Sequence, residues 1–361
     1  MTRNVTVRSL PKVALHDHLD GGLRVRTVLE LAADARYGEL PSEDPVELSE
    51  WFHQDGSGSL ERYLEAFAHT AAVTQTAEAI ERVAYEAAID LAHDGVVYAE
   101  VRFAPALHIV GGLSLEEVIE AALNGLSRGR GDSAIVTGLI PSALRQHRDS
   151  EQVAKAAARF AGEGVVGFDL AGPEAGYPPD DHLPAFHVVS EAGLGITIHA
   201  GEGDGAHSIY RAVAHCGARR IGHGVRIVDD TDWSGRDIEA IGPLARRIRD
   251  HRIHLEVSVR SNVDTGLAPD ARSHPLGALY RAGFSVSINT DNRLMSDVSM
   301  SDEYASALTD QGLTVTDLGL IAEEALRNAF GDWTERWRII SDVVRPAYAA
   351  AAAVASPPGS G

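Results

Sequence analysis

Short apolar segments alternate with longer stretches of helical periodicity along most of the chain. The apolar segments are mostly too short to show polar–apolar alternation, which is typical of strands buried on both faces of a parallel sheet. Eight segments have this character: Lys12–Leu15, Val96–Phe103, Ile135–Leu139, Val165–Leu170, Ile196–His199, Arg220–His223, Ile253–Ser258 and Ser285–Asn289. The pattern therefore predicts eight strands within one parallel sheet.

The stretches between these segments predict helices. Thr76–His93 places Ile80 and Val83 on one face at helical spacing, and Gly95 ends the pattern. Three further stretches show the same periodicity: Leu115–Leu126, Ser150–Ala161 and Leu183–Glu191.

Strands that alternate with helices predict the α/β class and a single (β/α)8 TIM barrel. Extra helices are expected after the first strand, around Trp51–Phe67. A doubly wound open sheet is the alternative on strand counting alone. We expect the barrel to span residues 1–348 and the alanine-rich residues 349–361, which end Ser-Pro-Pro-Gly-Ser-Gly, to be a disordered tail.

Charge and composition narrow the class of protein. The 361 residues include 32 Lys and Arg against 52 Asp and Glu, a net charge of -20, which disfavours a nucleic-acid partner. The single cysteine, Cys216, excludes an intramolecular disulfide framework and a Cys-rich zinc site. Neither a membrane-spanning stretch nor an apolar leader within Met1–Arg8 is evident. We expect a cytoplasmic protein without a membrane partner. A homo-oligomer remains possible.

Metal-binding residue types gather at the predicted strand ends, where barrels place their functional groups. His16 and His18 are two apart in an extended chain, so both imidazoles project the same way. His199 ends the fifth strand, His223 ends the sixth, and Asp291 follows the eighth. Three histidines and one carboxylate, with a position left for water, describe a catalytic zinc site or a similar divalent-ion site.

A single histidine is weak evidence for a metal, because the chain contains 16. The coincidence of five candidates at strand ends is the stronger observation. Several other histidines lie in helical or loop contexts, where we expect no ligand role: His53, His69, His93, His147 and His251.

Four ordered motifs resemble the adenosine deaminase family of the amidohydrolase superfamily. They are Leu15-His16-Asp17-His18-Leu19-Asp20-Gly21, His199-Ala200-Gly201-Glu202, Gly222-His223-Gly224 and Asn289-Thr290-Asp291. Supporting runs are Glu100-Val101-Arg102-Phe103-Ala104-Pro105, Asp169-Leu170-Ala171-Gly172, Ser261-Asn262 and His274-Pro275-Leu276. The resemblance extends from about Leu10 to Tyr348, and the run Asp291-Asn292-Arg293-Leu294-Met295-Ser296 is most similar to actinobacterial members.

The resemblance implies one zinc ion (Zn2+) per chain, held by His16, His18, His199 and Asp291. His223 would stand beside the hydroxide that the metal supplies, either accepting its proton or orienting it. Glu202 would protonate purine N1 as hydroxide attacks C6.

The resemblance also implies contacts to a purine nucleoside. The Gly172 amide would meet N3, Asp20 the ribose 5′-hydroxyl and Asn292 purine N7, while Tyr63 and Phe67 would form an apolar lid. Each has a plainer alternative: a tight loop for the glycine, loop orientation for the aspartate, and core packing for the aromatics.

Two departures from the family pattern concern the substrate. Many members have two consecutive aspartates where this chain has Asp291-Asn292, and Cys-Pro with a small residue where Ser258, Val259 and Arg260 stand. Arg260 could meet an anionic substituent or point to solvent.

The expected function is zinc-dependent deamination of adenosine and 2′-deoxyadenosine to inosine, 2′-deoxyinosine and ammonia. The alternatives are deamination of a modified 6-aminopurine nucleoside, such as 6-aminodeoxyfutalosine, and a non-catalytic metal-binding paralogue. Glu202 and His223 argue against the paralogue, because metal retention needs neither. A cytidine-deaminase-type zinc site is excluded, because it needs a Pro-Cys-x-x-Cys pair.

Overall fold

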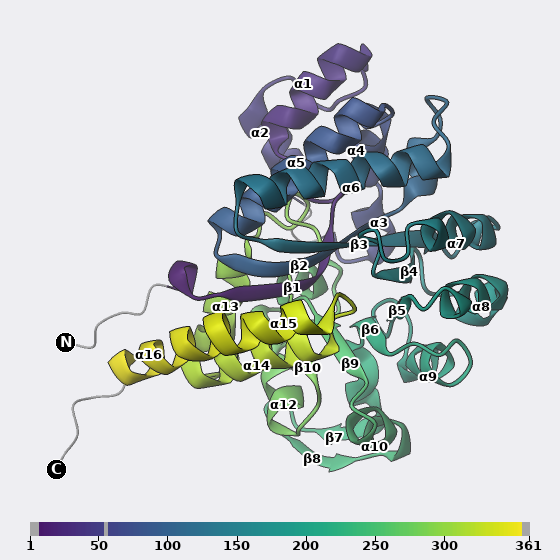
Figure 1. Cartoon of the computed structure of the whole chain (residues 1–361). Coiled ribbons are helices and arrows are strands. Elements are labelled where there is room, and N and C mark those ends of the chain that lie inside the picture. The colour runs from purple at the N-terminus through teal and green to yellow at the C-terminus, as the bar shows by residue number, and fades with distance from the viewer. Residues whose placement is uncertain (1–6, 54–56, 356–361) are drawn as a thin grey trace.

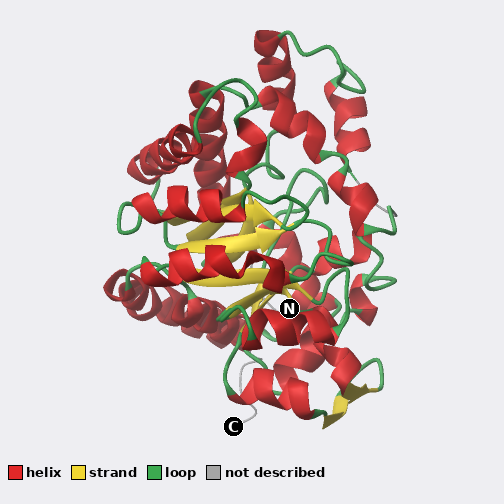
Figure 2. Cartoon of the chain, turned by 90° about the vertical axis from the view of Figure 1, so that its right-hand side faces the viewer, coloured by secondary structure: helices red, strands yellow, loops and turns green. Residues whose placement is uncertain are grey.

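A sheet of eight parallel strands forms the centre of the computed structural model, which describes residues 7–53 and 57–355. The spatial order is β1-β2-β3-β4-β5-β6-β9-β10, and helices surround the strands (Figures 1 and 2). The strands are β1 (Lys12–His18), β2 (Val96–Phe103), β3 (Val136–Leu144), β4 (Gly167–Ala171), β5 (Gly195–Ala200), β6 (Arg220–His223), β9 (His254–Val257) and β10 (Val286–Ile288). All eight predicted strands are confirmed, although β1 and β3 continue further than expected.

The sheet closes between its first and last strands. Asp17 and Asp291 form a parallel bridge between β1 and the segment that follows β10. The His18 amide donates to the Asp291 carbonyl at 2.8 Å, and the Asp291 amide donates to the His16 carbonyl at 3.0 Å. These bonds make the architecture a (β/α)8 barrel and exclude the open-sheet alternative. They also place β1 and the residues after β10 side by side at one end of the barrel.

Amphipathic helices cover the strands. Those between or after barrel strands include α5 (Ala77–His93), α6 (Leu115–Asp132), α7 (Ser150–Arg159), α8 (Leu183–Glu191), α9 (Ala206–Ala214), α10 (Pro243–Asp250), α12 (Leu276–Arg281), α13 (Met300–Thr309) and α14 (Val315–Asn328). In α6, Ser114 and Glu117 form a reciprocal capping box that fixes its start. The four predicted helices are present; α8 has the predicted bounds, and α6 continues to Asp132 rather than Leu126.

An insertion follows β1, as expected. It contains α1 (Val25–Ala35), α2 (Pro45–Phe52), α3 (Leu60–Leu64) and α4 (Phe67–Val73), coloured purple to blue in Figure 1. Side chains of α3 and α4, including Leu64 and Phe67, line a cavity that also contains His18 from the end of β1. The insertion therefore covers the carboxyl ends of the strands.

Two regions differ from the predictions. A hairpin of β7 (Thr231–Trp233) and β8 (Ile238–Ile241) precedes α10; its residues are partly or fully exposed, so it lacked the apolar signal of the barrel strands. Residues 349–355, expected to be disordered, are instead helical, because α16 (Arg345–Ala355) continues through the alanine-rich run after α15 (Trp333–Ile339). Alanine has the highest helix propensity, which explains this helix. Residues 356–361 of the expected tail lie outside the described residues.

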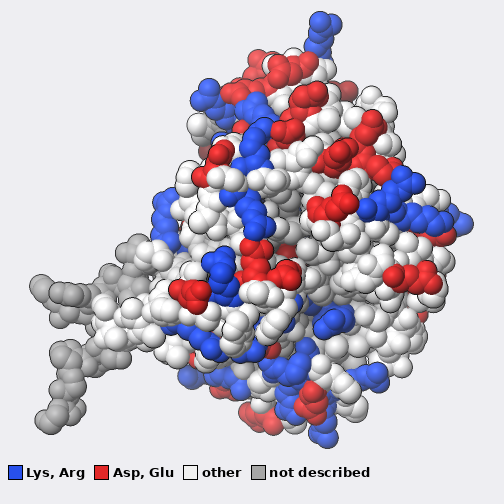
Figure 3. All heavy atoms as spheres, viewed as in Figure 1, with Lys and Arg blue, Asp and Glu red and all other residues white. Residues whose placement is uncertain are grey.

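Two further observations concern partners. Within the described ranges, no helix combines the length and apolarity needed to cross a bilayer. Acidic and basic side chains are interspersed on the face shown in Figure 3, and no continuous basic surface is visible there.

Candidate functional site

The five candidate metal-site residues meet at the carboxyl end of the barrel. Ligand atoms of His16, His199, His223 and Asp291 all lie within 4.8 Å of one another. His18 Nε2 is close to the same group, 3.3 Å from His199 Nε2 and 3.4 Å from Asp291 Oδ1. The structure therefore brings all five together, and the group of four whose ligand atoms all lie within 4.8 Å of one another contains His223 rather than His18.

Carboxylates stand behind two of these histidines. His16 Nδ1 lies 3.0 Å from Glu256 Oε2, and His199 Nδ1 lies 3.1 Å from Asp169 Oδ1. An ionised carboxylate only accepts, so each Nδ1 carries a proton, and in a neutral ring this leaves the lone pair on Nε2. His16 Nε2 is buried and has no hydrogen-bond partner among the described residues. It lies 3.3 Å from Asp291 Oδ1.

The floor below these histidines is a buried network of charges. Glu256 accepts hydrogen bonds from Arg102 Nη2 at 2.7 Å, Arg220 Nε at 2.6 Å and Thr197 Oγ1 at 3.0 Å. Burial alone would raise the pKa of Glu256, but Arg102 and Arg220 outweigh it and hold that pKa well below its usual value. Glu256 is therefore ionised and able to fix the orientation of His16.

Strained backbone aims two side chains into the site. His223 has φ 61° and Asp291 has φ 60°, both in the left-handed region that side-chain-bearing residues rarely adopt. The parallel pairing of His223 with Ala200 and of Asp291 with Asp17 holds them there. Such strain persists only where surrounding structure enforces it, and it is frequent at functional sites.

The neighbours of His223 differ from those of His16 and His199. Asn262, in the short helix α11 (Val259–Asp264), places Nδ2 3.0 Å from His223 Nδ1. His223 Nε2 lies 3.4 Å from Glu202 Oε2 and 3.9 Å from Asp291 Oδ2. Burial holds the pKa of His223 well below its usual value, so its imidazole is neutral. His223 thus has an amide group next to Nδ1 and carboxylates next to Nε2.

The loop that carries Glu202 is anchored by a second carboxylate. Glu174 accepts hydrogen bonds from the amides of Gly201 at 2.6 Å and Glu202 at 3.0 Å. It also accepts from the amides of Gly203 and Asp204 at 2.7 and 2.9 Å. Four backbone donors on one carboxylate fix the path of this loop and thereby the position of the Glu202 side chain.

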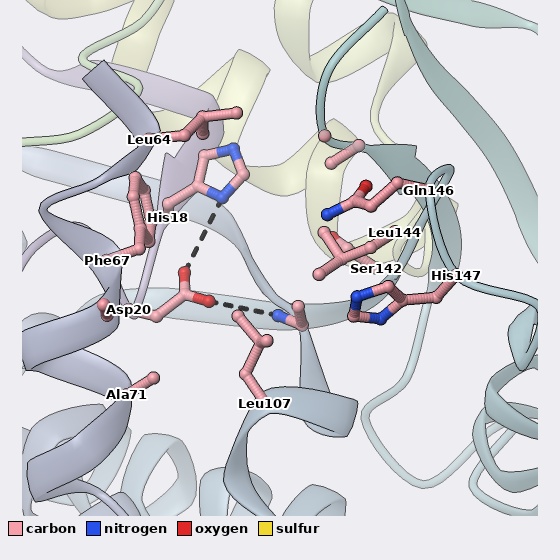
Figure 4. Close-up of a pocket in the computed structure, with 14 residues that line it drawn as sticks. His18, Asp20, Leu64, Phe67, Ala71, Leu107, Ser142, Leu144, Gln146 and His147 are labelled. Carbon is pink, nitrogen blue, oxygen red and sulfur yellow. Dashed lines mark hydrogen bonds and ion pairs between the residues drawn. The ribbon is translucent and has the colours of Figure 1, made fainter. Parts of the chain in front are cut away.

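Two adjoining cavities open beside this group. The inner cavity, of about 30 Å³, is lined by Glu202, His223, Asp291, Asn292 and Tyr63 among others. The outer cavity, of about 270 Å³, contains Asp20 and ends at polar side chains of Gln146 and His147. Both cavities share His18, Leu64, Phe67, Ala171 and Gly172. Figure 4 shows His18, Asp20 and Phe67 facing Leu144, Gln146 and His147 across the outer cavity.

The predicted substrate-binding residues therefore all line one or both cavities. Gly172 has φ 95°, so the loop needs glycine there. Asp20 accepts from the Ala104 amide at 3.2 Å; burial would raise its pKa, but the imidazoles of His108 and His18 lower it below the usual value. The Tyr63 hydroxyl hydrogen-bonds to Ser296 at 2.8 Å. Asn292 Oδ1 is buried without a hydrogen-bond partner in the described part of the chain.

Several contacts settle questions that the sequence left open. Arg260 Nη2 lies 2.9 Å from His53 Nε2, and its side chain lines a separate cavity with Glu303 rather than either cavity of the site. Sequence reasoning assigned no role to Glu256, Glu174 or Asn262. Glu256 could have been noticed, because a charged residue in the middle of a buried apolar strand needs a buried partner.

Known proteins provide an independent comparison. The profile of the family described as "Adenosine deaminase" matches residues 11–346. The adenosine deaminase of Mycobacterium marinum is 49% identical over 349 residues, covering 95% of this chain and 96% of that protein.

Among solved structures, an adenine deaminase from Arthrobacter aurescens is 26% identical with a TM-score of 0.82, covering 95% of this chain and 99% of that one. An amidohydrolase from Burkholderia ambifaria with bound Zn is 24% identical with a TM-score of 0.84, covering 97% and 93%, a likeness in fold alone. The match of the family profile across nearly the whole barrel, together with this identity to a curated relative, shows that the chain is an enzyme of the adenosine deaminase family.

Proposed function

We propose that this enzyme hydrolyses adenosine and 2′-deoxyadenosine to inosine, 2′-deoxyinosine and ammonia. The proposal rests on one observation. His16 and His199, each with a carboxylate at Nδ1, lie close to Asp291, His223 and Glu202 beside one cavity. The named function of the relative at 49% identity supports the same reaction.

The residues fit one zinc ion per chain, held by His16, His18, His199 and Asp291. His16 Nε2 is buried without a hydrogen-bond partner among the described residues, and carboxylates hold the Nδ1 protons of His16 and His199. Such a carboxylate behind each imidazole is the usual arrangement around a metal. When bound, zinc lowers the pKa of a water to about 7 and so supplies hydroxide.

Glu202 is proposed to act as the acid at purine N1. A carboxylic acid there delivers a proton to N1 as the water oxygen forms its bond to C6. The C6–N6 bond then breaks, and the amino group takes one proton of the water and leaves as ammonia. The other proton restores Glu202, and the product keeps the proton on N1. The loop anchored by Glu174 holds Glu202 in place throughout.

The remaining contacts are assigned to the nucleoside. The Gly172 amide would donate to N3, and the Asn292 amide would donate to N7. Tyr63 and Phe67 would cover the base from the insertion, where both line the inner cavity. Asp20 lies in the outer cavity with a lowered pKa, so its ionised carboxylate would accept from the ribose 5′-hydroxyl and repel a 5′-phosphate.

A modified 6-aminopurine nucleoside, such as 6-aminodeoxyfutalosine, is the second candidate substrate. The outer cavity continues beyond Asp20 to Gln146 and His147, whose polar side chains could accept a larger substituent. Arg260 lies outside both cavities, so it gives no support to an anionic substituent.

A substrate panel tests the proposal. Zinc-loaded protein is assayed with adenosine, 2′-deoxyadenosine, adenine, AMP and 5′-modified adenosines, recording ammonia release and the ultraviolet change. We expect the highest kcat/KM for the two unmodified nucleosides and little turnover of AMP. Turnover confined to a 5′-modified nucleoside would favour the second candidate, and turnover of none would refute the deaminase assignment.

A further inference from the structure

A chain of hydrogen bonds leads from the first turn of α12 to His223. Leu276 is the first residue of that helix, so its backbone N–H has no partner within the helix. It donates instead to His274 Nδ1 at 3.2 Å. His274 Nε2 lies 3.1 Å from Asn262 Oδ1, and Asn262 Nδ2 lies 3.0 Å from His223 Nδ1.

The direction of every bond in this chain follows from its first member. A backbone N–H can only donate, so His274 Nδ1 accepts and the proton of that ring is on Nε2. The atom of Asn262 that faces Nε2 must then accept, which makes it the oxygen. The other terminal atom of Asn262 is the NH2 group, which can only donate. His223 Nδ1 therefore accepts a hydrogen bond and carries no proton.

Burial isolates this series of hydrogen bonds from water. His274 is 3% exposed, Asn262 0% and His223 1%. Burial also lowers the pKa of His274 to about 3, which keeps its ring neutral and able to accept at Nδ1. Because Nδ1 of His223 accepts a hydrogen bond, the one proton of that ring is on Nε2, which faces carboxylate oxygens of Glu202 and Asp291.

We propose that Asn262 and His274 are positioning residues that hold His223 as the Nε2–H tautomer. His223 consequently donates a hydrogen bond to the oxygen that attacks C6 and does not accept its proton. This role rests on the proposed deaminase function, whereas the tautomer itself does not. It also separates His223 from the metal ligands, because a nitrogen that carries a proton has no lone pair for a metal.

The tautomer is tested directly by nitrogen-15 NMR. Zinc-loaded protein labelled on its histidine ring nitrogens is recorded without substrate, and His223→Gln identifies the resonances of residue 223. We expect Nε2 of His223 to carry the proton and Nδ1 to carry none. A proton on Nδ1 would overturn the proposal. Because no turnover is involved, this result is independent of the substrate panel.

Replacing the amide tests the role of the proton. Asn262→Asp keeps the shape but offers His223 an acceptor, so the proton is expected on Nδ1. We expect kcat to fall about 10²- to 10³-fold, the usual cost of one lost transition-state donor, with KM and zinc content unchanged. Normal kcat with the proton on Nδ1 would contradict the role. If the NMR spectrum shows both ring nitrogens protonated, the donor survives, and a large loss of kcat would contradict it.

A matched pair tests the outer link. His274→Leu removes the donor to Asn262 and is expected to lower kcat. His274→Gln retains an oxygen to accept from Leu276 and an NH2 group to donate to Asn262, so it should restore most of that loss. Equal losses in both variants would show that His274 does not act through its hydrogen bonds.

Discussion

The two sides of the site differ in what stands behind each imidazole. On one side, Glu256 and Asp169 accept from Nδ1 of His16 and His199. On the other side, the Asn262 amide faces Nδ1 of His223. A carboxylate leaves a lone pair on Nε2, whereas an amide donor leaves a proton there. Proximity alone places His223 among four possible ligands that lie within 4.8 Å of one another, but its neighbour Asn262 indicates a different role.

The largest expected contrast between the two sides is in metal content. His199→Ala and His16→Ala should each lose zinc and all activity, because each removes a proposed ligand. His223→Ala should keep about one zinc per chain while losing turnover. Elemental analysis of the purified variants measures the difference. Full zinc in an inactive His199→Ala would remove His199 from the ligand set, and loss of zinc from His223→Ala would place His223 in it.

Glu202 lies next to His223, and its variant tests whether proton transfer to the substrate occurs on this side of the site. Glu202→Gln keeps the shape but cannot deliver a proton to N1, a role worth about two to four orders of magnitude in rate. Zinc content and inhibitor binding should remain near normal. Steady-state kinetics gives the effect, and near-normal turnover would mean that another group or water protonates the ring.

A smaller loss is expected when only the neighbour of a proposed metal ligand is changed. Asp169→Asn replaces the carboxylate behind His199 with an amide, giving His199 a neighbour of the kind that His223 has. We expect zinc affinity to fall about 10- to 100-fold, as is usual when the partner behind a metal ligand is lost. The control is Asn262→Asp, which should not lower zinc affinity. Competition with a chelator measures both, and equal affinities in the two variants would erase the distinction.

Asn292 provides a comparably small expected effect, because it is proposed to contact the substrate away from the reacting atoms. A 7-deaza nucleoside replaces N7 by C–H and leaves the asparagine amide unpaired, at a cost of about 1–3 kcal/mol, or roughly ten- to a hundredfold in kcat/KM. Asn292→Leu should penalise adenosine by a similar amount and abolish the difference between the two substrates. Additive losses in this double cycle would mean that Asn292 does not touch N7.

The sequence predicted the residues at the strand ends better than the residues behind them. His16, His199, His223 and Asp291 belong to local motifs, and their meeting follows from the barrel topology. Glu256 and Asn262 are distant in sequence from the histidines that they contact, 240 residues from His16 and 39 residues from His223 respectively, so no local pattern reveals their partners. The hairpin of β7 and β8 and the helix α16 were missed because one is partly exposed and the other is an alanine run without a distinct apolar face.

Neutron diffraction of the deuterated, zinc-loaded enzyme tests the central distinction most directly, because it locates the hydrogens on all three rings at once. The account predicts deuterium on Nδ1 of His16 and His199, with Nε2 bare in both, and the reverse pattern in His223: deuterium on Nε2 and a bare Nδ1. Deuterium on Nδ1 of His223, or on Nε2 of His16 or His199, would contradict it.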